Sequence, residues 1–326
     1  MKAITFTRYR EFDSLRLEDV PKPVPKEDEL RVRVHASSVN SWDWEYFNGT
    51  PFVNRLMFGL RKPRPGRQRL GADIAGTVES VGGRVTRFKE GDAVFGDLWD
   101  RWGGFAQYAC IPESSVQSKP DTLSFEQAAA VPQAGILALQ GLRKFRQIRP
   151  GHKVLINGAG GGVGSFAIQL ARMYGAMVTG VDAAHKLDFI LSLGAQQVID
   201  CAREDYTERG ERYDLIVDCQ NNRSMFDIRR ALAEEGVYAM IGGSMGRVYQ
   251  LWILSLLARF TRERRTLCLV AEGPNKGLDY LKDLLQTGKL VPALDRSYPL
   301  HQVAEALRYF GEGVHTGKIT IRIDAA

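Results

Sequence analysis

One segment, residues 153–164, constrains the fold of this chain more than any other. It reads KVLINGAGGGVG: a short apolar run leads straight into a glycine-rich turn, and the amphipathic stretch GSFAIQLARMYG follows. The turn consists of Gly158, Ala159, Gly160, Gly161, Gly162, Val163 and Gly164. Glycines permit a close approach of the backbone, and the N–H groups that open a helix attract phosphate. A strand, such a turn and a helix in this order predict a dinucleotide-binding unit.

Apolar and helical segments alternate around this turn. The expected strands are 153–158, 177–182, 197–200, 213–219 and 236–243, and the expected helices are 164–175, 186–194 and 223–236. Strands that alternate with helices predict a parallel sheet covered on both faces. We therefore expect an α/β fold with a Rossmann-type, doubly wound parallel sheet.

The first third of the chain is rich in short strands instead. The expected strands are 30–39, 71–82, 92–98 and 105–111, separated by turn signals such as Gly82-Gly83 and Gly103-Gly104. This pattern predicts a compact, barrel-like β domain. Residues 124–142 predict a helix, with Ser124 and Gln127 at the spacing of a capping box.

The end of the chain returns to mixed character, with strands at 267–271 and 318–323 and helices at 278–288 and 301–313. We expect a dinucleotide-binding domain over residues 123–264. The second domain is expected to combine residues 1–122 with residues 265–326.

Length and composition exclude several classes of protein. The 326 residues, 44% hydrophobic and 25% charged, suit ordinary globular domains. The cysteines Cys110, Cys201, Cys219 and Cys268 form no CxxC pair, which argues against a disulfide framework and a cysteine-rich zinc site. The net charge of +6 is mixed with 38 acidic residues, so no nucleic-acid partner is expected. Because no signal peptide or membrane-spanning run stands out, we expect a cytoplasmic protein without an integral membrane segment.

An acidic residue, Asp182, ends the second strand of the dinucleotide unit. A carboxylate there accepts hydrogen bonds from the adenosine ribose and repels a 2′-phosphate, which favours NAD(H) over NADP(H). The alternative is a capping role for the helix that starts near His185. Lys186 is close enough in sequence to reach a phosphate, so it counts as a second candidate contact.

The sequence resembles zinc-free medium-chain dehydrogenases/reductases of the quinone oxidoreductase group. It is similar to bacterial NAD(P)-dependent alcohol dehydrogenase homologues and to reticulon-interacting oxidoreductases. The matching segments are ASSVNSWDWEYFNG (36–49), LGADIAGTVESVG (70–82), VTRFKEGDAVFGD (85–97), LSFEQAAAVP (123–132), INGAGGGVGSFAIQLA (156–171), RYDLIVD (212–218) and HTGKITI (315–321). The resemblance implies a GroES-like β-barrel catalytic domain, a Rossmann domain, a nicotinamide cofactor and a homodimer.

Departures from the family pattern refine this expectation. Zinc-binding relatives carry cysteine near Ser41 or Trp42 and a His-Glu pair where this chain has Ala72-Asp73, so we expect no metal. Relatives that bind NADPH read Cys-Ser-Thr-Arg where this chain reads DAAH (182–185), and Tyr where it has Cys201. These missing 2′-phosphate contacts, together with Asp182, favour NADH within an NAD(P)H-dependent family.

The resemblance places the substrate floor at Asn40 and at residues 44–46, so Asn40, Glu45 and Tyr46 are candidate catalytic residues. Tyr46 is a candidate proton donor, with an aromatic core contact as the alternative. For Asn40 the alternative is a turn-capping amide, and Asp43 is expected to cap or pair structurally.

Four further residues are implied as cofactor contacts: Asn221, Gly242, Gly243 and Lys318. For Lys318 the alternative is a surface strand cap. Leu137 stands where relatives carry a threonine near the nicotinamide.

Hydride transfer to a small-molecule quinone or α,β-unsaturated carbonyl is the expected activity. The alternatives are a catalytically weak dinucleotide-binding sensor or partner protein, and a zinc alcohol dehydrogenase. Two regions have more than one interpretation. The basic loop 61–69 is a solvated loop or an anion site. The apolar stretch 248–260 is a lid, a dimer interface or a membrane contact.

Overall fold

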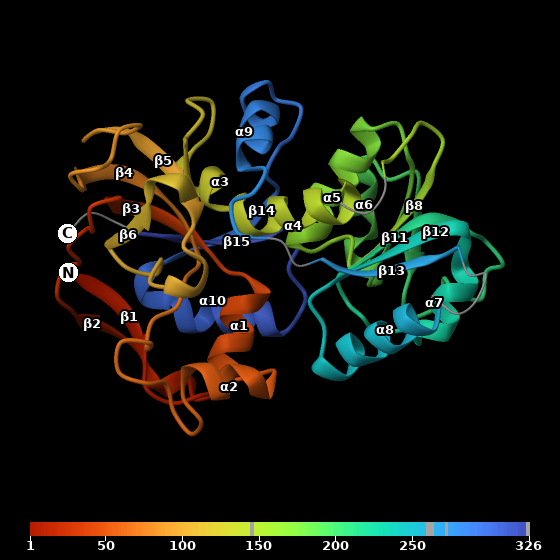
Figure 1. The fold of residues 1–326 in the computed structure, drawn as a ribbon, viewed down its shortest axis with the longest axis horizontal. Helices are drawn as coiled ribbons and strands as arrows, with labels where there is room; N and C mark the ends of the chain where they lie inside the picture. The colour runs from red at the N-terminus through yellow and green to blue at the C-terminus, as the bar shows by residue number, and fades with distance from the viewer. Residues whose placement is uncertain (144–146, 259–263, 271–272, 324–326) are drawn as a thin grey trace. The chain divides into compact units, whose positions relative to one another are not determined.

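The protein is described here by a computed structural model that covers residues 1–143, 147–258, 264–270 and 273–323 (Figure 1). The chain divides into two compact units: unit 1 is Met1–Ile136 with Pro274–Ala326, and unit 2 is Leu137–Gly273. Both boundaries lie later than residues 122 and 264, the ends expected from the sequence. The second differs because the strand after residue 265 pairs into the sheet of unit 2. No described helix has the length and apolar character required to cross a membrane.

A parallel sheet forms the centre of unit 2. Its strands within the described residues are β8 (Lys153–Asn157), β9 (Met177–Asp182), β10 (Gln197–Asp200), β11 (Tyr213–Asp218), β12 (Leu232–Ile241) and β13 (Thr266–Val270). They lie in the order β10-β9-β8-β11-β12-β13, and every neighbouring pair is parallel. The register places Asn157 beside both Val181 and Asp218. The ends of β8, β9 and β11 therefore meet at one edge of the sheet.

Helices cover both faces of this sheet, as the alternating pattern predicts. They are α5 (Gly162–Met173), α6 (Leu187–Ser192), α7 (Met225–Ala231) and α8 (Met245–Ala258). Within unit 2, α5 and α6 lie on one face and α7 and α8 on the other (Figure 1). The expected α/β fold with a parallel sheet is confirmed.

Unit 1 is built on a mostly antiparallel main sheet and a separate pair of strands. The strands of unit 1 are β1 (Lys2–Phe6), β2 (Leu15–Asp19), β3 (Glu29–Ser38), β4 (Asp73–Val81), β5 (Ala93–Asp97), β6 (Tyr108–Pro112), β7 (Val116–Ser118), β14 (Leu294–Pro299) and β15 (Lys318–Arg322). The order of the main sheet is β14-β15-β3-β4-β5-β7; β6 pairs with β3, and β1 pairs with β2. Because β15 pairs with β3, strands that are far apart in the sequence lie side by side in one sheet.

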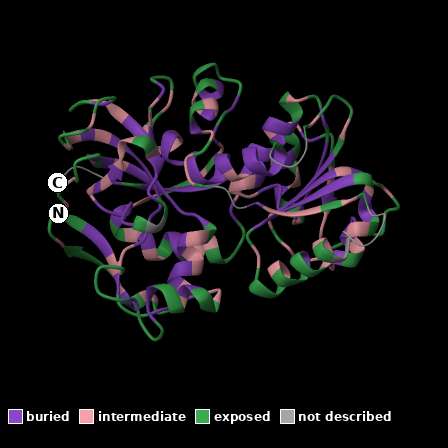
Figure 2. Cartoon of the chain, viewed as in Figure 1, coloured by how far each residue is buried: buried purple, intermediate pink, exposed green. Residues whose placement is uncertain are grey.

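The helices of unit 1 surround this sheet. They are α1 (Ser41–Asn48), α2 (Phe52–Phe58), α3 (Phe125–Ala129), α9 (Leu278–Gln286) and α10 (Val303–Gly311), and α4 (Pro132–Arg143) crosses from unit 1 into unit 2. Each sheet carries buried side chains along its strands (Figure 2). An aromatic cluster that includes Phe6, Tyr46 and Trp102 fills part of the unit 1 core.

Several element boundaries differ from the sequence-based expectation, and two of the differences concern helices. The helix expected over 124–142 is two helices, because Pro132 starts the second one and has no N–H to continue the first. The helix expected over 223–236 ends at Ala231, and β12 begins at Leu232, where pairing with β11 takes over.

Candidate functional site

The glycine-rich turn of unit 2 lies where β8 ends and α5 begins. Gly158 has a φ of 84°, in the left-handed region that favours glycine. A Cβ on Gly164 would lie 2.3 Å from the carbonyl oxygen of Gly158, so this helix position packs directly against the turn. The first N–H groups of α5, which include those of Gly162 and Val163, have no acceptor within the helix. The arrangement presents backbone donors to an anion at the edge of the sheet.

Gly164→Ala is expected to weaken both folding and dinucleotide binding, because the turn has to move away from the new methyl group. We expect a loss of stability of about 1–3 kcal/mol and a clear rise in the Kd for the dinucleotide. Thermal unfolding and fluorescence titration measure the two effects. Gly246→Ala in α8 is the matched control, since the added Cβ would lie 3.9 Å from the Ser244 hydroxyl oxygen, an ordinary contact distance. Equal behaviour of the two variants would contradict the packing argument.

Asp182, at the end of β9, is bound to the turn itself. One carboxylate oxygen accepts the Gly160 N–H at 2.9 Å, and the other accepts the Ala183 N–H at 2.9 Å. The Nζ of Lys186 lies 3.8 Å from the carboxylate, and both side chains are buried. The Lys186 stem packs on Gly160, where an added Cβ would lie 2.8 Å from its Cδ. Asp182, Lys186 and the turn thus form one cluster.

Asn221, Gly242 and Gly243 gather at the ends of β11 and β12. The Asn221 side-chain amide donates to the Ile241 carbonyl at 3.0 Å, and a Cβ on Gly243 would lie 3.3 Å from that amide nitrogen. The buried carboxylate of Asp218 fixes this loop by accepting the Asn221 N–H at 2.8 Å.

The sequence analysis missed Asp218, which also accepts from the side chains of Asn157 and Tyr238, both at 2.9 Å. The signal that identifies it is a charged residue directly after the apolar run LIV (215–217) of the segment YDLIVDC. A carboxylate at such a place requires hydrogen-bond partners when it is buried.

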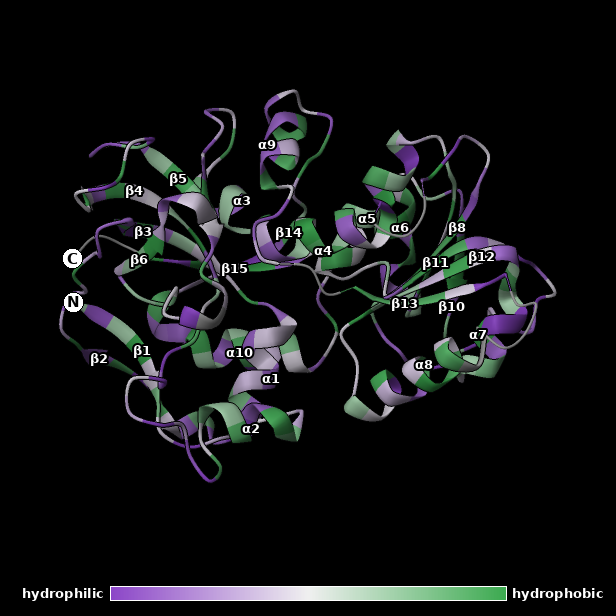
Figure 3. Ribbon diagram, in the orientation of Figure 1, coloured by the Kyte–Doolittle hydropathy of each residue, from purple (hydrophilic) through white to green (hydrophobic). Residues whose placement is uncertain are grey.

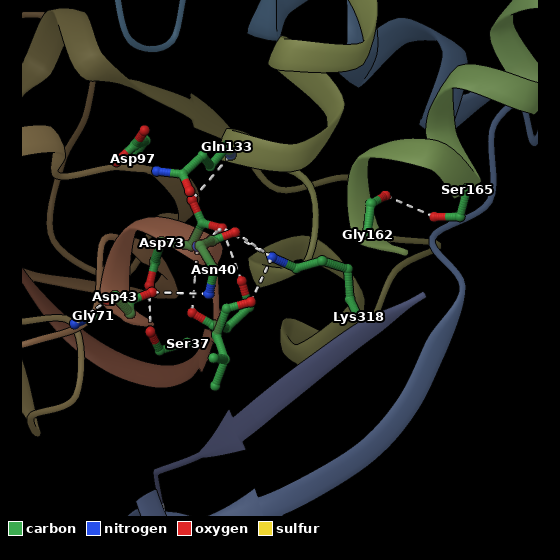
Figure 4. Close-up of polar contacts among 12 residues, drawn as sticks. Ser37, Asn40, Asp43, Gly71, Asp73, Asp97, Gln133, Gly162, Ser165 and Lys318 are labelled. Atoms are coloured by element: carbon green, nitrogen blue, oxygen red, sulfur yellow. Dashed lines mark hydrogen bonds and ion pairs between the residues drawn. The ribbon is translucent and has the colours of Figure 1, made fainter. Parts of the chain in front are cut away.

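A buried polar cluster occupies the interior of unit 1 (Figure 4). The Lys318 ammonium on β15 donates to the Asn40 side-chain oxygen and to the Val39 carbonyl, and lies 3.7 Å from the Asp73 carboxylate. Asp73 also accepts from the Asn40 amide at 2.9 Å and from the Ser38 hydroxyl at 2.8 Å. Lys318 is 3% exposed and Asp73 is fully buried, so the pair lies out of contact with solvent.

Two more carboxyl groups belong to this polar cluster. Asp43 accepts the N–H groups of Asn40 and Gly71, which gives it the structural role expected from the sequence. Burial raises the pKa of Asp43 to about 7. Burial and the neighbouring Asp73 also raise the pKa of Asp97. The pKa of Lys318 is lowered by burial, although the carboxylates oppose this shift.

The three candidate catalytic residues have different surroundings. The Asn40 amide is occupied on both sides by Lys318 and Asp73. Tyr46 is fully buried among aromatic rings and donates its hydroxyl to the Arg67 carbonyl, which favours the core contact over the proton donor. Glu45 is half-buried, and burial raises its pKa to about 7. Of the three, Glu45 alone combines partial exposure with a pKa near neutrality.

Comparisons with known proteins agree along the whole chain. Residues 26–121 match the alcohol dehydrogenase GroES-like domain, and residues 193–321 match the zinc-binding dehydrogenase domain. A chloroplastic quinone-oxidoreductase homolog of Spinacia oleracea is 32% identical over 98% of both chains. An NADPH-dependent alkenal/one oxidoreductase of Arabidopsis thaliana is 30% identical over 98% of this chain and 79% of its own. A quinone oxidoreductase structure from Coxiella burnetii superposes with a TM-score of 0.87 at 29% identity over 99% of both chains.

The chain belongs to the quinone oxidoreductase-like group of medium-chain dehydrogenases/reductases. This membership assigns unit 1 to the GroES-like catalytic domain and unit 2 to the Rossmann domain that binds NAD(P)H. The fold and the family expected from the sequence are both confirmed.

One of the matching domains of this dehydrogenase/reductase is named for zinc, but the residues of this chain do not fit a zinc site. Within the described residues, no group of His, Cys, Asp and Glu side chains is arranged to hold a metal ion. In the polar cluster, Asp43 and Asp73 are directed at backbone N–H groups, Asn40 and the Lys318 ammonium.

Proposed function

We propose that this medium-chain dehydrogenase/reductase reduces quinones or α,β-unsaturated carbonyl compounds with NAD(P)H. The observation that carries the proposal is its end-to-end similarity to proteins named as quinone and alkenal/one oxidoreductases. The glycine turn of unit 2 supports it, since its geometry suits a dinucleotide pyrophosphate. The overall reaction consumes one hydride and one proton for each acceptor reduced.

The bound nicotinamide supplies the hydride, and the chain supplies its placement. The turn from Gly158 to Gly164 presents backbone N–H groups to the pyrophosphate, while Asp182 faces the adenosine end. At the nicotinamide end, Asn221, Gly242 and Gly243 provide polar atoms and open backbone. Lys318 is proposed to act on the polar cluster rather than on the dinucleotide, because its ammonium is already paired with Asn40 and Asp73.

We propose Glu45 as the group that supplies the proton. A general acid is most effective when its pKa lies close to the working pH, and burial brings the pKa of Glu45 to about 7. The half-buried side chain on α1 keeps access to solvent, from which it can regain the proton after each turnover.

The homodimer and the cytoplasmic location stay predictions from the sequence.

The preference for NADH over NADPH is also proposed, on the basis of Asp182. Its buried carboxylate lies at the turn, where a 2′-phosphate would bring a second negative charge. Lys186 acts in the opposite direction, because its ammonium compensates part of that charge. The pair therefore predicts a preference for NADH, with NADPH accepted more weakly.

Asp182→Ser is expected to improve NADPH binding by about tenfold, because one unfavourable charge is removed and Lys186 becomes available to the phosphate. Titrations of NADH and NADPH against the purified variant measure the change. Asp188→Ser removes an equal charge from an exposed site and is the control. If NADPH affinity does not change in the Asp182 variant, Asp182 does not select the cofactor.

The proposed activity is tested by oxidation of NADH and NADPH in the presence of a panel of quinones and enones. Turnover with any acceptor supports the oxidoreductase. Tight binding of the dinucleotide without turnover across the panel would instead support the sensor or partner protein.

A further inference from the structure

Residues 52–69 form a surface in unit 1 and include none of the residues proposed for cofactor binding or proton transfer. They comprise α2 and the loop that follows it, and we call them the α2 surface. The buried side of α2 is small: Phe58 packs on Tyr46 with a ring separation of 4.6 Å, and Asn54 donates to the Thr50 carbonyl. Phe58 and Asn54 are 4% and 9% exposed. The rest of the helix faces outward.

The outward side of α2 is apolar, where an ordinary surface helix is polar. Phe52, Leu56, Met57 and Leu60 are 62%, 56%, 59% and 54% exposed. Phe52 and Leu56 are four residues apart, which places them on one side of the helix, and Leu60 follows after Gly59, where the helix has ended. Much of the helix is coloured as exposed in Figure 2 and as hydrophobic in Figure 3. A contiguous apolar surface of this kind marks an interaction site.

The same surface is strongly basic. The stretch from Tyr46 to Ala72 has no Asp or Glu, whereas it contains Arg55, Arg61, Lys62, Arg64, Arg67 and Arg69. Arg61, Lys62 and Arg64 are exposed, and no carboxylate of the described residues pairs with them. The chain thus presents unpaired cations directly beside exposed apolar side chains.

This combination fits an anionic lipid surface better than other partners. A nucleic acid or an acidic protein would neutralise the arginines but leave the side chains of Phe52, Leu56 and Met57 in water. A second copy of the chain would bring the same cations face to face in a two-fold contact. A bilayer with anionic headgroups accommodates both the apolar and the cationic side chains. The apolar residues enter the boundary between headgroups and acyl chains, and the cations stay with the phosphates.

We propose that the α2 surface docks this protein on anionic lipid bilayers. Seven residues of helix are too few to span a bilayer, so α2 lies in the interface plane, with Phe52, Leu56 and Leu60 inserted and Arg61, Lys62 and Arg64 at the phosphates. Binding weakens with rising salt because part of it is electrostatic.

Co-sedimentation of the full chain with vesicles tests the proposal. The probes are vesicles of phosphatidylcholine alone and of phosphatidylcholine with roughly one third phosphatidylglycerol. We expect binding to the anionic vesicles and little to the neutral ones. Arg61→Glu/Lys62→Glu/Arg64→Glu is expected to lower the partition coefficient by at least about 100-fold, and Phe52→Ser/Leu56→Ser by about tenfold or more.

Arg16→Glu/Arg33→Glu/Lys289→Glu is the matched control, because it changes three exposed cations of unit 1 and gives an equal change in net charge. It should bind vesicles within about threefold of the parent chain. All variants should keep their unfolding temperature and their turnover of soluble substrates, since every changed residue is exposed.

Three results would overturn the proposal. The first is no binding to anionic vesicles by the parent chain. The second is equal loss of binding in the control and in the α2 variants. The third is a change in oligomeric state on light scattering when Phe52 and Leu56 are replaced, without any change in vesicle binding, which would assign the surface to a second copy of the chain.

Discussion

Lys318→Met is expected to destabilise unit 1 by about 3–5 kcal/mol, the loss found when one partner of a buried ion pair is removed. The ammonium is the cation that faces the buried carboxyl groups of Asp43, Asp73 and Asp97. Without it, these groups have to take up protons or stay charged in an apolar interior. Urea unfolding followed by circular dichroism measures the loss.

The loss should depend on pH in a defined direction. Burial raises the pKa of Asp43 from 3.8 in an unfolded chain to about 7, so the folded protein holds a proton that the unfolded chain releases. This contribution to stability is complete below about pH 4 and disappears as the pH rises through 7. Removing the Lys318 charge raises the carboxyl pKa values further. The variant should therefore lose more stability, relative to the parent chain, at pH 8 than at pH 5.

A second substitution provides the control for Lys318→Met. Lys318→Met/Asp97→Asn removes one negative charge from the cluster and keeps an oxygen for the Trp99 N–H, which Asp97 accepts at 2.7 Å. The double variant should recover part of the lost stability. If it is as unstable as the single variant at pH 8, the loss comes from packing of the lysine stem rather than from charge.

Glu45→Gln is expected to lower kcat by about 10²–10⁴-fold, the usual contribution of a positioned general acid. Glutamine keeps the size of the side chain but has no proton of suitable acidity. In the parent enzyme kcat should fall as the pH rises above about 7, because Glu45 loses its proton there. The variant should be slow and nearly independent of pH over the same range.

Two comparisons keep this prediction specific. Glu305→Gln on α10 replaces an exposed glutamate and should leave kcat unchanged. The Kd for NADH should be nearly equal in parent and Glu45 variant, because glutamine keeps the size of the side chain and the proposed pyrophosphate contacts are backbone groups of the turn from Gly158 to Gly164. If Tyr46→Phe abolishes turnover while Glu45→Gln does not, the proton comes from Tyr46, the other candidate.

The dinucleotide turn could be predicted from the sequence because its requirements are local. Gly158 and Gly164 lie six residues apart in one strand–turn–helix unit, and the structure places them as the spacing predicts. Asp182 belongs to the next strand, and its position beside Gly160 follows from the parallel pairing of β8 and β9. Local spacing and one strand pairing are enough to assemble this half of the site.

The polar cluster could not be predicted in the same way, since its members meet only through the tertiary fold. Asn40 and Lys318 are 278 residues apart in the sequence, yet they form a hydrogen bond. In the sequence Asp73 is an ordinary residue at the start of a strand. Its place in the cluster depends on the pairing of β3 with β4 and with β15. The raised pKa of Glu45 likewise depends on burial that no sequence pattern displays.

The late position of Lys318 has a consequence for the order of events during synthesis. Unit 2 is a continuous stretch, Leu137–Gly273, and all of it leaves the ribosome before β15 is made. The nascent chain therefore carries Asp43, Asp73 and Asp97 without their counter-cation while the Rossmann domain already folds. The polar cluster of unit 1 can therefore be completed only after β15 has been synthesised, later than every strand of unit 2.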